Sequence, residues 1–261
     1  MDRDLTAACE LAVTLAERAG RLQVERRDSL RVGAPKEHAN DVVSDVDVAS
    51  ERLIVSEIGA RWPDDAIQAE EGHGRAGTSG WTWIIDPLDG TRNYISRTGP
   101  WSVCIALCEG DVARAAVVHD PATGETFSAV AGAGASRNGT PIAASAGPPL
   151  DQALLGASFQ PSPETKARAG RLLRELLPVI GDIRRVPAAL NLAYQADGRL
   201  DGGFALDTKP WDIAAGVLIA REAGVVLGGA ADDAPLTRLL IGATRPLWPE
   251  VSSRVRAALS A

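Results

Sequence analysis

The segment Trp83-Ile84-Ile85-Asp86-Pro87-Leu88-Asp89-Gly90-Thr91 decides how this sequence folds. Its apolar half predicts a buried strand over residues 82–85, because short apolar runs suit the interior of a sheet. Asp86 follows the strand, Pro87 fixes the backbone, and Asp89-Gly90 is a common turn dipeptide. Two carboxylates at the end of a buried strand repel each other unless a cation lies between them. The segment therefore predicts a metal site rather than a simple turn.

The oxygen ligands of this segment favour Mg²⁺, which binds carboxylate, carbonyl, water and phosphate oxygens. Gly90 and Thr91 add backbone N–H groups that suit phosphate oxygens, and a hydroxyl able to orient a water. The formal charge of −7, from 34 acidic and 27 basic residues, argues against a nucleic-acid duplex as partner. We expect a metal ion, not a lysine cluster, to supply the positive charge that phosphate needs.

Further acidic residues stand at the ends of predicted elements. They are Asp41, Asp45 and Asp47, the pair Glu70-Glu71, and Asp212. Each has a structural explanation of its own. Asp47 follows Ser44 at the spacing of a capping box, and Asp212 lies in the first turn of a predicted helix, where the macrodipole favours negative charge. The residue types alone leave both interpretations open.

The rest of the chain shows two different patterns of predicted secondary structure. Helices are predicted over residues 4–27 and 46–62 from apolar periodicity and a capping-box start. Residues 101–136 alternate short apolar runs with turns, which predicts an antiparallel meander. After a Pro-rich connector, strands alternate with helices. We therefore expect an N-terminal α+β half over residues 1–145, carrying most metal ligands, and a C-terminal α/β half over 146–261, carrying Asp212 and the substrate side of the pocket.

Several classes of protein are excluded by composition. The 3 cysteines and 3 histidines are scattered without zinc-site spacing, so the cysteines read as buried residues of a reducing compartment. The N-terminus has no apolar core behind basic residues, unlike a signal peptide. No stretch approaches the ~18 apolar residues of a membrane-spanning helix. We expect a cytoplasmic protein with no membrane partner.

The residues from Asp86 to Asn93 resemble the signature D-P-[IL]-D-G-T-x-N of the inositol monophosphatase family. Other family motifs follow the same order: residues 41–47 resemble D-x-V-T-x-x-D, and Glu70-Glu71, Asn138-Gly139 and Trp211-Asp212 have counterparts. The resemblance covers nearly the whole chain. It implies a Mg²⁺-dependent, Li⁺-sensitive phosphatase of α/β (α+β) class. The implied fold is the αβαβα layered sandwich shared with fructose-1,6-bisphosphatase, usually as a homodimer.

The resemblance assigns metal ligands by position in the motifs. Glu71, Asp86 and the carbonyl of Leu88 would hold a first Mg²⁺. Asp86, Asp89 and Asp212 would hold a second ion. A third, looser ion would rest on Glu71 and waters. Two or three ions per site are therefore expected, one lowering the pKa of the attacking water and another stabilising the leaving alkoxide.

The resemblance also assigns catalytic roles. Thr91 and Asp47 would orient and deprotonate the water that attacks phosphorus, with Glu71 as a third catalytic residue. The amides of Gly90 and Thr91 would hold the phosphate. Lys36 falls where the family often places a basic residue on a loop, although an ordinary solvated lysine explains it equally well.

The positions that read the substrate depart from the family. Members acting on inositol phosphates usually carry a glutamate where this chain has Ala205, and a G-[ST]-A segment where it has Val186-Pro187-Ala188. Asp207 or Arg185 are candidates to replace the lost contacts. We expect a small phosphorylated metabolite, with inositol 1-phosphate as the leading candidate and histidinol phosphate, a sugar bisphosphate or a 3′-phosphonucleotide as alternatives. The expected phosphate and substrate contacts are Asp89, Gly90, Thr91, Arg185, Ala205 and Asp212.

Two hypotheses from other classes compete with an enzyme. The first hypothesis is a nucleotide-binding module, because residues 72–77 formally match G-x-G-x-x-G. These residues follow two glutamates, which would repel a pyrophosphate, and precede Thr78-Ser79-Gly80 rather than an apolar helix. We therefore interpret the match as a chance one. A catalytically silent homologue acting as a binding protein is the other alternative. The intact set of predicted metal ligands argues against it.

Overall fold

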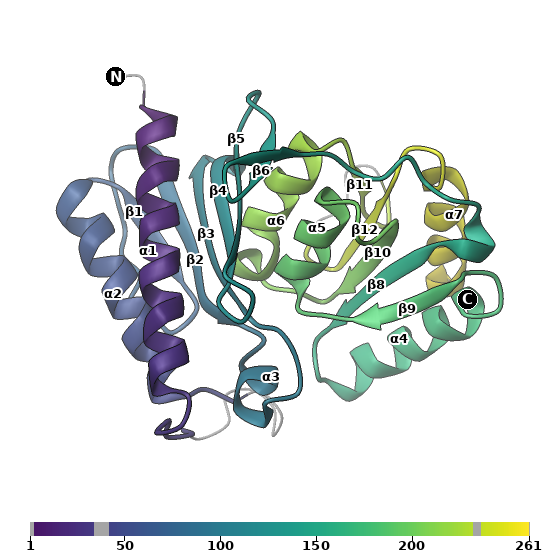
Figure 1. The fold of residues 1–261 in the computed structure, drawn as a ribbon, viewed down its shortest axis with the longest axis horizontal. Coiled ribbons are helices and arrows are strands. Elements are labelled where there is room, and N and C mark those ends of the chain that lie inside the picture. The colour runs from purple at the N-terminus through teal and green to yellow at the C-terminus, as the bar shows by residue number, and fades with distance from the viewer. Residues whose placement is uncertain (1–2, 34–41, 232–235, 261) are drawn as a thin grey trace.

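The computed structural model describes residues 3–33, 42–231 and 236–260 (Figure 1). In chain order the helices are α1 (Leu5–Arg26), α2 (Asp45–Arg61), α3 (Thr91–Ser96), α4 (Pro163–Leu176), α5 (Ala188–Ala196), α6 (Pro210–Glu222) and α7 (Trp248–Ser260), with a 3₁₀ turn at Leu150–Gln152. The strands are β1 (Ala66–Ala69), β2 (Trp81–Asp89), β3 (Ser102–Glu109), β4 (Val112–Asp120), β5 (Glu125–Val130), β6 (Ala135–Arg137), β7 (Thr140–Ile142), β8 (Leu154–Phe159), β9 (Asp182–Arg185), β10 (Gly202–Leu206), β11 (Val226–Gly228) and β12 (Leu239–Ala243).

These strands form two sheets. The first has the order β1-β2-β3-β4-β5-β6-β7, in which β1 and β2 are parallel and the later neighbours are antiparallel. This sheet contains the predicted meander. The second has the order β11-β12-β10-β8-β9, with parallel pairing around β8 and antiparallel pairing at β12. The expected division after residue 145 lies in the segment that joins the two sheets.

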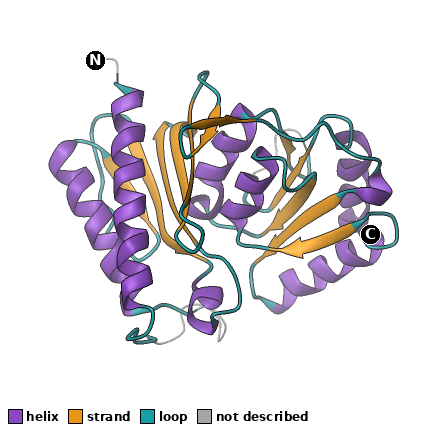
Figure 2. Ribbon diagram, in the orientation of Figure 1, coloured by secondary structure: helices purple, strands orange, loops and turns teal. Residues whose placement is uncertain are grey.

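Helices cover both faces of each sheet, so the molecule is layered (Figure 2). α1 and α2 pack on one face of the first sheet through an apolar cluster that includes Leu15, Ile54 and Trp83. α5 and α6 lie between the two sheets, where small residues such as Ala189 and Ala215 let the layers approach closely. α4 and α7 cover the outer face of the second sheet. This order of layers confirms the predicted αβαβα sandwich.

Strand β2 extends further along the chain than the sequence predicts. The strand was predicted to end at residue 85, but it runs to Asp89, with a shift of its pairing register against β3 between Asp86 and Asp89. Pro87 lacks the N–H that regular pairing would require, which explains an irregularity at this point. The irregularity places both aspartates near the end of the strand.

Gln23, on α1, anchors this irregular segment from behind. Its amide nitrogen donates to the carbonyl of Pro87 at 2.7 Å, and its amide oxygen accepts from Nε1 of Trp101 at 2.9 Å. Its backbone carbonyl accepts from the hydroxyl of Tyr94 at 2.7 Å. The Gln23 side chain is fully buried. A buried amide with satisfied partners fixes the position of groups that an apolar side chain would leave free to shift.

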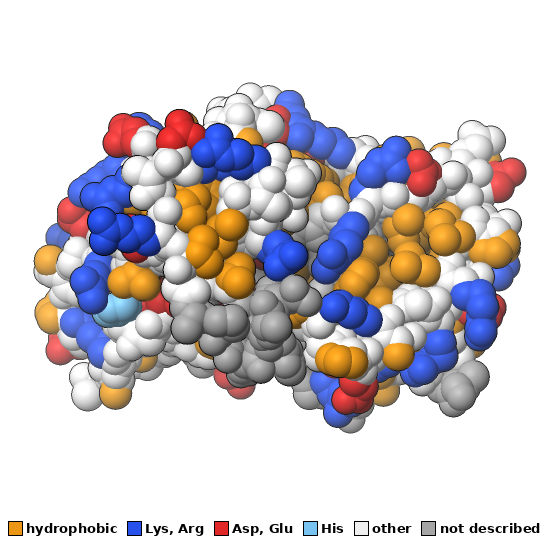
Figure 3. Space-filling view, turned by 90° about the horizontal axis from the view of Figure 1, so that it is seen from below, with side chains coloured by type: hydrophobic (Ala, Val, Ile, Leu, Met, Phe, Trp, Pro, Cys, Tyr) orange, Lys and Arg blue, Asp and Glu red, His pale blue; other side chains and the backbone are white. Residues whose placement is uncertain are grey.

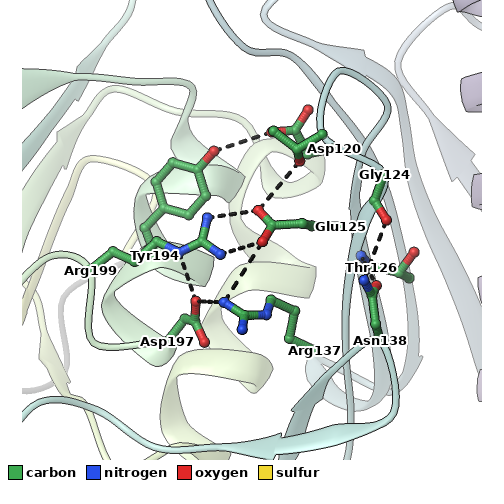
Figure 4. Close-up of polar contacts among 10 residues, drawn as sticks. Asp120, Gly124, Glu125, Thr126, Arg137, Asn138, Tyr194, Asp197 and Arg199 are labelled. Carbon is green, nitrogen blue, oxygen red and sulfur yellow. Dashed lines mark hydrogen bonds and ion pairs between the residues drawn. The ribbon is translucent and has the colours of Figure 1, made fainter.

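A second polar network joins the two halves of the molecule (Figure 4). Arg199 donates to Glu125 of β5 at 2.7 Å, and Asp197, at the end of α5, accepts from Arg137 of β6 at 2.5 Å. Tyr194 of α5 donates to Asp120 at 3.2 Å. The C-terminal end of α5 is thereby held to the first sheet.

Among the helices that the structure describes, none combines the length and the apolar character that a membrane-spanning segment needs.

The Gln23 anchor yields a test of the fold. Gln23→Leu should lower the free energy of unfolding by about 3 kcal/mol, because it leaves the Pro87 carbonyl and the Trp101 N–H buried without partners. Urea denaturation of the two proteins measures the difference. Glu25→Leu, at an exposed position of the same helix, is the matched control and should stay within about 0.5 kcal/mol of the unsubstituted protein. Equal losses in the two variants would refute the anchor.

Candidate active site

A pocket of about 540 Å³ opens where the end of β2 and α3 meet the ends of β8, β9 and the start of α5. Four carboxylate residues line it: Glu70, Asp86, Asp89 and Asp212. Gly90 and Thr91 line it from the first half, and Phe159, Gln160, Arg185 and Val186-Pro187-Ala188 line it from the second. The pocket therefore needs both halves of the chain.

Asp86 and Asp89 enter this pocket from the irregular end of β2. Oδ1 of Asp86 accepts from the N–H of Leu88 at 2.9 Å, and Oδ2 of Asp89 accepts from the N–H of Ala189, at the start of α5, at 2.9 Å. Burial raises the pKa of both carboxyl groups well above the usual range. The nearby charges of Glu70 and Asp212 raise them further. Such groups are poised to accept a cation.

Asp212 completes this set from the first turn of α6. Its Oδ2 accepts from the backbone N–H of Lys209 at 2.8 Å and from Nε2 of Gln160 at 2.9 Å. Burial raises its pKa to about 7, although these hydrogen bonds lower it. Asp212 thus caps the start of α6, as the helix-start interpretation predicts, and it also lines the pocket. Gln160 was not predicted as a site residue from the sequence. The single feature of the sequence that could have indicated it is its position just after the segment that forms β8.

Asp47 also has two functions in the structure. Its Oδ2 accepts from the N–H of Ser44 at 3.0 Å, and this bond closes the predicted capping box of α2. Its Oδ1 accepts from the hydroxyl of Thr91 at 3.0 Å. The same Thr91 hydroxyl oxygen also lies 3.1 Å from the carbonyl oxygen of Leu88. Burial raises the pKa of Asp47 to about 6. Asp47 is fully buried and reaches the pocket through Thr91, which lines it.

The structure brings Glu70, rather than the predicted Glu71, into the pocket. The N–H of Glu70 donates to the carbonyl of Ile85 at 3.2 Å, which sets residue 70 beside Asp86. The backbone then turns, and the N–H of Glu71 donates to Glu51 of α2 at 2.6 Å. Glu71 is not among the residues lining the pocket. Two adjacent glutamates look alike in sequence, and the end of strand β1 decides between them.

The substrate-side predictions have mixed outcomes. Arg185 and Val186-Pro187-Ala188 line the pocket as expected. Ala205 does not: it is 2% exposed in β10 and packs with Ala188 and Ile213 beneath the pocket wall. Asp207 turns away to accept hydrogen bonds from Arg168 and Thr165. The two remaining candidate positions, Lys36 and Asp41, lie outside the described residues.

Gly90 is required where the two halves meet. Its φ is +97°, a left-handed conformation, and it precedes α3. A Cβ at this position would lie 2.9 Å from Cγ of Pro187 in the second half. A side chain there would push the pocket open, so glycine is dictated by the close approach as well as by the turn.

The donor chemistry of the pocket fits a hard divalent cation. Its candidate ligands are carboxylate and carbonyl oxygens; burial, and then the charges of neighbouring carboxylates, raise the pKa of Asp86 and Asp212. Among the described residues, no group of three or more His, Cys, Asp or Glu side chains is arranged so that it could hold a metal ion. The fit therefore rests on the kind and burial of the oxygen donors.

Comparisons with known proteins agree with this geometry. The model of the inositol monophosphatase family matches residues 3–258. The chain is 38% identical over 221 residues to Nus factor SuhB of Escherichia coli K12, covering 83% of each protein. It superposes on the suhB extragenic suppressor protein of Bartonella henselae with a TM-score of 0.89 and 30% identity, covering 96% of this chain and 98% of that one.

A second solved structure, an IMPase of Thermotoga maritima, gives a TM-score of 0.86 at 30% identity and covers 96% of this chain and 97% of that one. The family model spans nearly the full length, including all four carboxylates of the pocket. The fold, the order of motifs and the relatives lead to one assignment. The chain belongs to the inositol monophosphatase family.

Proposed function

We propose that the chain is a Mg²⁺-dependent phosphatase that hydrolyses small phosphomonoesters. The observation that carries the proposal is the meeting of three buried carboxylates with raised pKa values, Asp86, Asp89 and Asp212, in one pocket. Membership of a family of generally metal-dependent phosphatases supports it. Inositol 1-phosphate, the leading candidate from sequence, serves as the reference substrate.

The metal ions have candidate ligands in this chain. Glu70 takes the place that the sequence had suggested for Glu71, together with Asp86, Asp89, Asp212 and the carbonyl of Leu88. The two or three ions expected from the family resemblance would share these oxygens. When bound, Mg²⁺ offsets the carboxylate charges, polarises the phosphoryl group and lowers the pKa of water.

Thr91 and Asp47 provide the path for a proton. The Thr91 hydroxyl donates to Oδ1 of Asp47, so its lone pair is available to a water in the pocket. A proton taken from that water reaches Oδ1 of Asp47 through the hydroxyl. With a pKa of about 6, Asp47 is an effective base near neutral pH.

The turn after β2 supplies donors for the phosphate. α3 begins at Thr91, and no side chain caps its first turn. Backbone N–H groups at such a turn are available to phosphate oxygens. Gly90 keeps this approach free of a side chain. The phosphate would thus lie between the amides of the turn and the carboxylate ligands of the metal ions.

A role as a binding protein is the second candidate function. The observation that favours it is the name Nus factor, which curated relatives such as the E. coli protein carry. Complementation separates the candidates: in cells lacking this protein, rescue by a variant without phosphatase activity would assign the role to binding. The homodimer implied by the family resemblance stays a prediction, which a measured mass in solution tests.

Asp89→Asn tests the metal site. The variant should lose at least about 10²-fold in kcat/KM with Mg²⁺, because a neutral amide is a poor ligand for the cation. Its metal-free form should be more stable than the unsubstituted protein, because one of the repelling buried charges is gone. Phosphate release and thermal unfolding measure the two effects. Asp111→Asn, at an exposed turn, is the control and should change neither. Full activity in Asp89→Asn would refute the site.

The pKa of Asp212 predicts a pH-dependent stability of the metal-free protein. The folded-state pKa of Asp212 is raised to about 7, above its ordinary value, so protonation of Asp212 stabilises the folded protein at low pH. This stabilisation is lost as pH rises through 7. Asp212→Asn keeps an acceptor for the two hydrogen bonds but has no charge. Relative to the unsubstituted protein, its free energy of unfolding should rise by roughly 2 kcal/mol between pH 5.5 and pH 8.

Urea denaturation in the presence of a chelator measures this difference. Comparing the two proteins at each pH cancels the titration of groups that do not interact with Asp212, such as the buried His119. Saturating Mg²⁺ should reverse the order at pH 8, because the cation stabilises only the protein that keeps its carboxylate ligand. A difference that is independent of pH would contradict the burial-raised pKa of Asp212.

A further inference from the structure

Two arginine side chains line the same pocket as the carboxylates: Arg92 on α3 and Arg185 at the end of β9. Within the described residues, neither lies within ion-pair distance of an acidic side chain. Neighbouring arginines differ in this respect. Arg184 pairs with Asp182 at 2.5 Å, and Arg97 pairs with Asp28 at 2.5 Å. Arg92 and Arg185 thus bring to the pocket positive charges that no acidic side chain of the described residues pairs directly.

Arg185 is held in place by contacts that do not neutralise it. Its guanidinium lies 4.2 Å from the ring centroid of Phe159, and Nη2 donates to the Phe159 carbonyl at 3.3 Å. Arg185 is exposed as a whole residue, but partial burial of its guanidinium lowers its pKa, although an arginine stays charged at neutral pH. Stacking on an aromatic ring restricts the side chain while leaving most of its N–H donors unused. A fixed, charged fork of donors is suited to a carboxylate or phosphate.

The acceptors that would read a neutral polyol are missing from the two expected positions. Ala205 has no polar side chain and lies beneath the pocket wall. Asp207 is occupied by Arg168 and Thr165. A further polar group in the wall, the hydroxyl of Ser158, donates to the carbonyl of Val186 at 2.7 Å. The balance on the substrate side therefore favours an anionic ligand group over a set of hydroxyls.

The surface around the pocket agrees with this balance. Seen from below, the face carrying α3 has Lys and Arg side chains both near its middle and toward its edges, whereas Asp and Glu side chains lie chiefly toward the edges (Figure 3). The whole chain has a formal charge of −7, so this positive charge is local. Local positive potential in a cleft attracts anionic substrates.

We infer that the physiological substrate carries a second anionic group, a carboxylate or a second phosphate, on the part that leaves with the alcohol, and that Arg92 and Arg185 bind it. This inference rests on the proposed phosphatase function and names its substrate class. The same geometry disfavours substrates with a cationic leaving part, such as histidinol phosphate. If the two arginines were only solvated surface residues, the protein would show no preference for a substrate with a second anionic group.

Matched substrates test the inference with the Mg²⁺-loaded, full-length protein. The carboxylate pair is 3-phosphoglycerate against glycerol 3-phosphate, and the phosphate pair is fructose 1,6-bisphosphate against fructose 1-phosphate. We expect kcat/KM to be about tenfold higher for the anionic member of at least one pair, the effect of one charge-assisted contact. The pair that shows the preference identifies the anion. Equal or lower values for both anionic members would overturn the inference.

Arginine variants attribute the preference to its residues. Arg185→Gln and Arg92→Gln should each reduce the ratio of kcat/KM between the anionic and neutral substrates about tenfold, mainly through KM. Arg184→Gln, on the same strand and paired with Asp182, is the matched control and should leave the ratio unchanged. Because the ratio is taken within one protein, a general loss of activity cancels. An unchanged ratio in both pocket variants would refute the assignment.

The two levels of the proposal fail differently. If glycerol 3-phosphate and fructose 1-phosphate are hydrolysed with Mg²⁺ but the anionic members show no advantage, the phosphatase function stands and the second-anion site is wrong. If none of the four compounds nor inositol 1-phosphate is hydrolysed, the proposed function fails, and this inference fails with it.

Discussion

Repulsion between buried carboxylates is the constraint on which the rest of this structure depends. Asp86 and Asp89 come from β2, Asp212 comes from α6, and all three have raised pKa values in the metal-free protein. Burying like charges together is costly, and the surrounding fold must hold them against that cost. A site of this kind is stable only on a rigid scaffold, and it becomes favourable when a cation binds.

The scaffold meets this constraint with polar anchors at both ends of the pocket. Gln23 holds the irregular end of β2 from behind, through the Pro87 carbonyl. α5 spans the two halves: the N–H of Ala189 at its start donates to Asp89, and Asp197 at its end is paired with Arg137. The helix therefore links a carboxylate of the pocket to a distant ion-pair network, and its position couples the two sheets.

The cleavage side and the recognition side of the pocket follow different rules. On the proposed cleavage side, Asp47 and Asp212 both complete helix starts; Asp212 also lines the pocket, and Asp47 contacts Thr91, which lines it. The recognition side has Arg185 stacked on Phe159 and an apolar Ala205 below. If the proposed reaction is correct, this separation would let recognition change while the residues proposed to hold the phosphate stay the same.

By itself, the sequence determined most helices and strands through apolar periodicity, and its motifs determined the family and most of the carboxylate set, because both are local properties of the chain. The layered fold was predicted from the family resemblance. The predicted helices over residues 4–27 and 46–62 match α1 and α2 closely. Tertiary structure alone decided that Glu70 rather than Glu71 faces the pocket, that Gln160 binds Asp212, and that Ala205 lies beneath the wall. These outcomes depend on where a strand ends and which face a side chain takes, and packing against distant segments sets both.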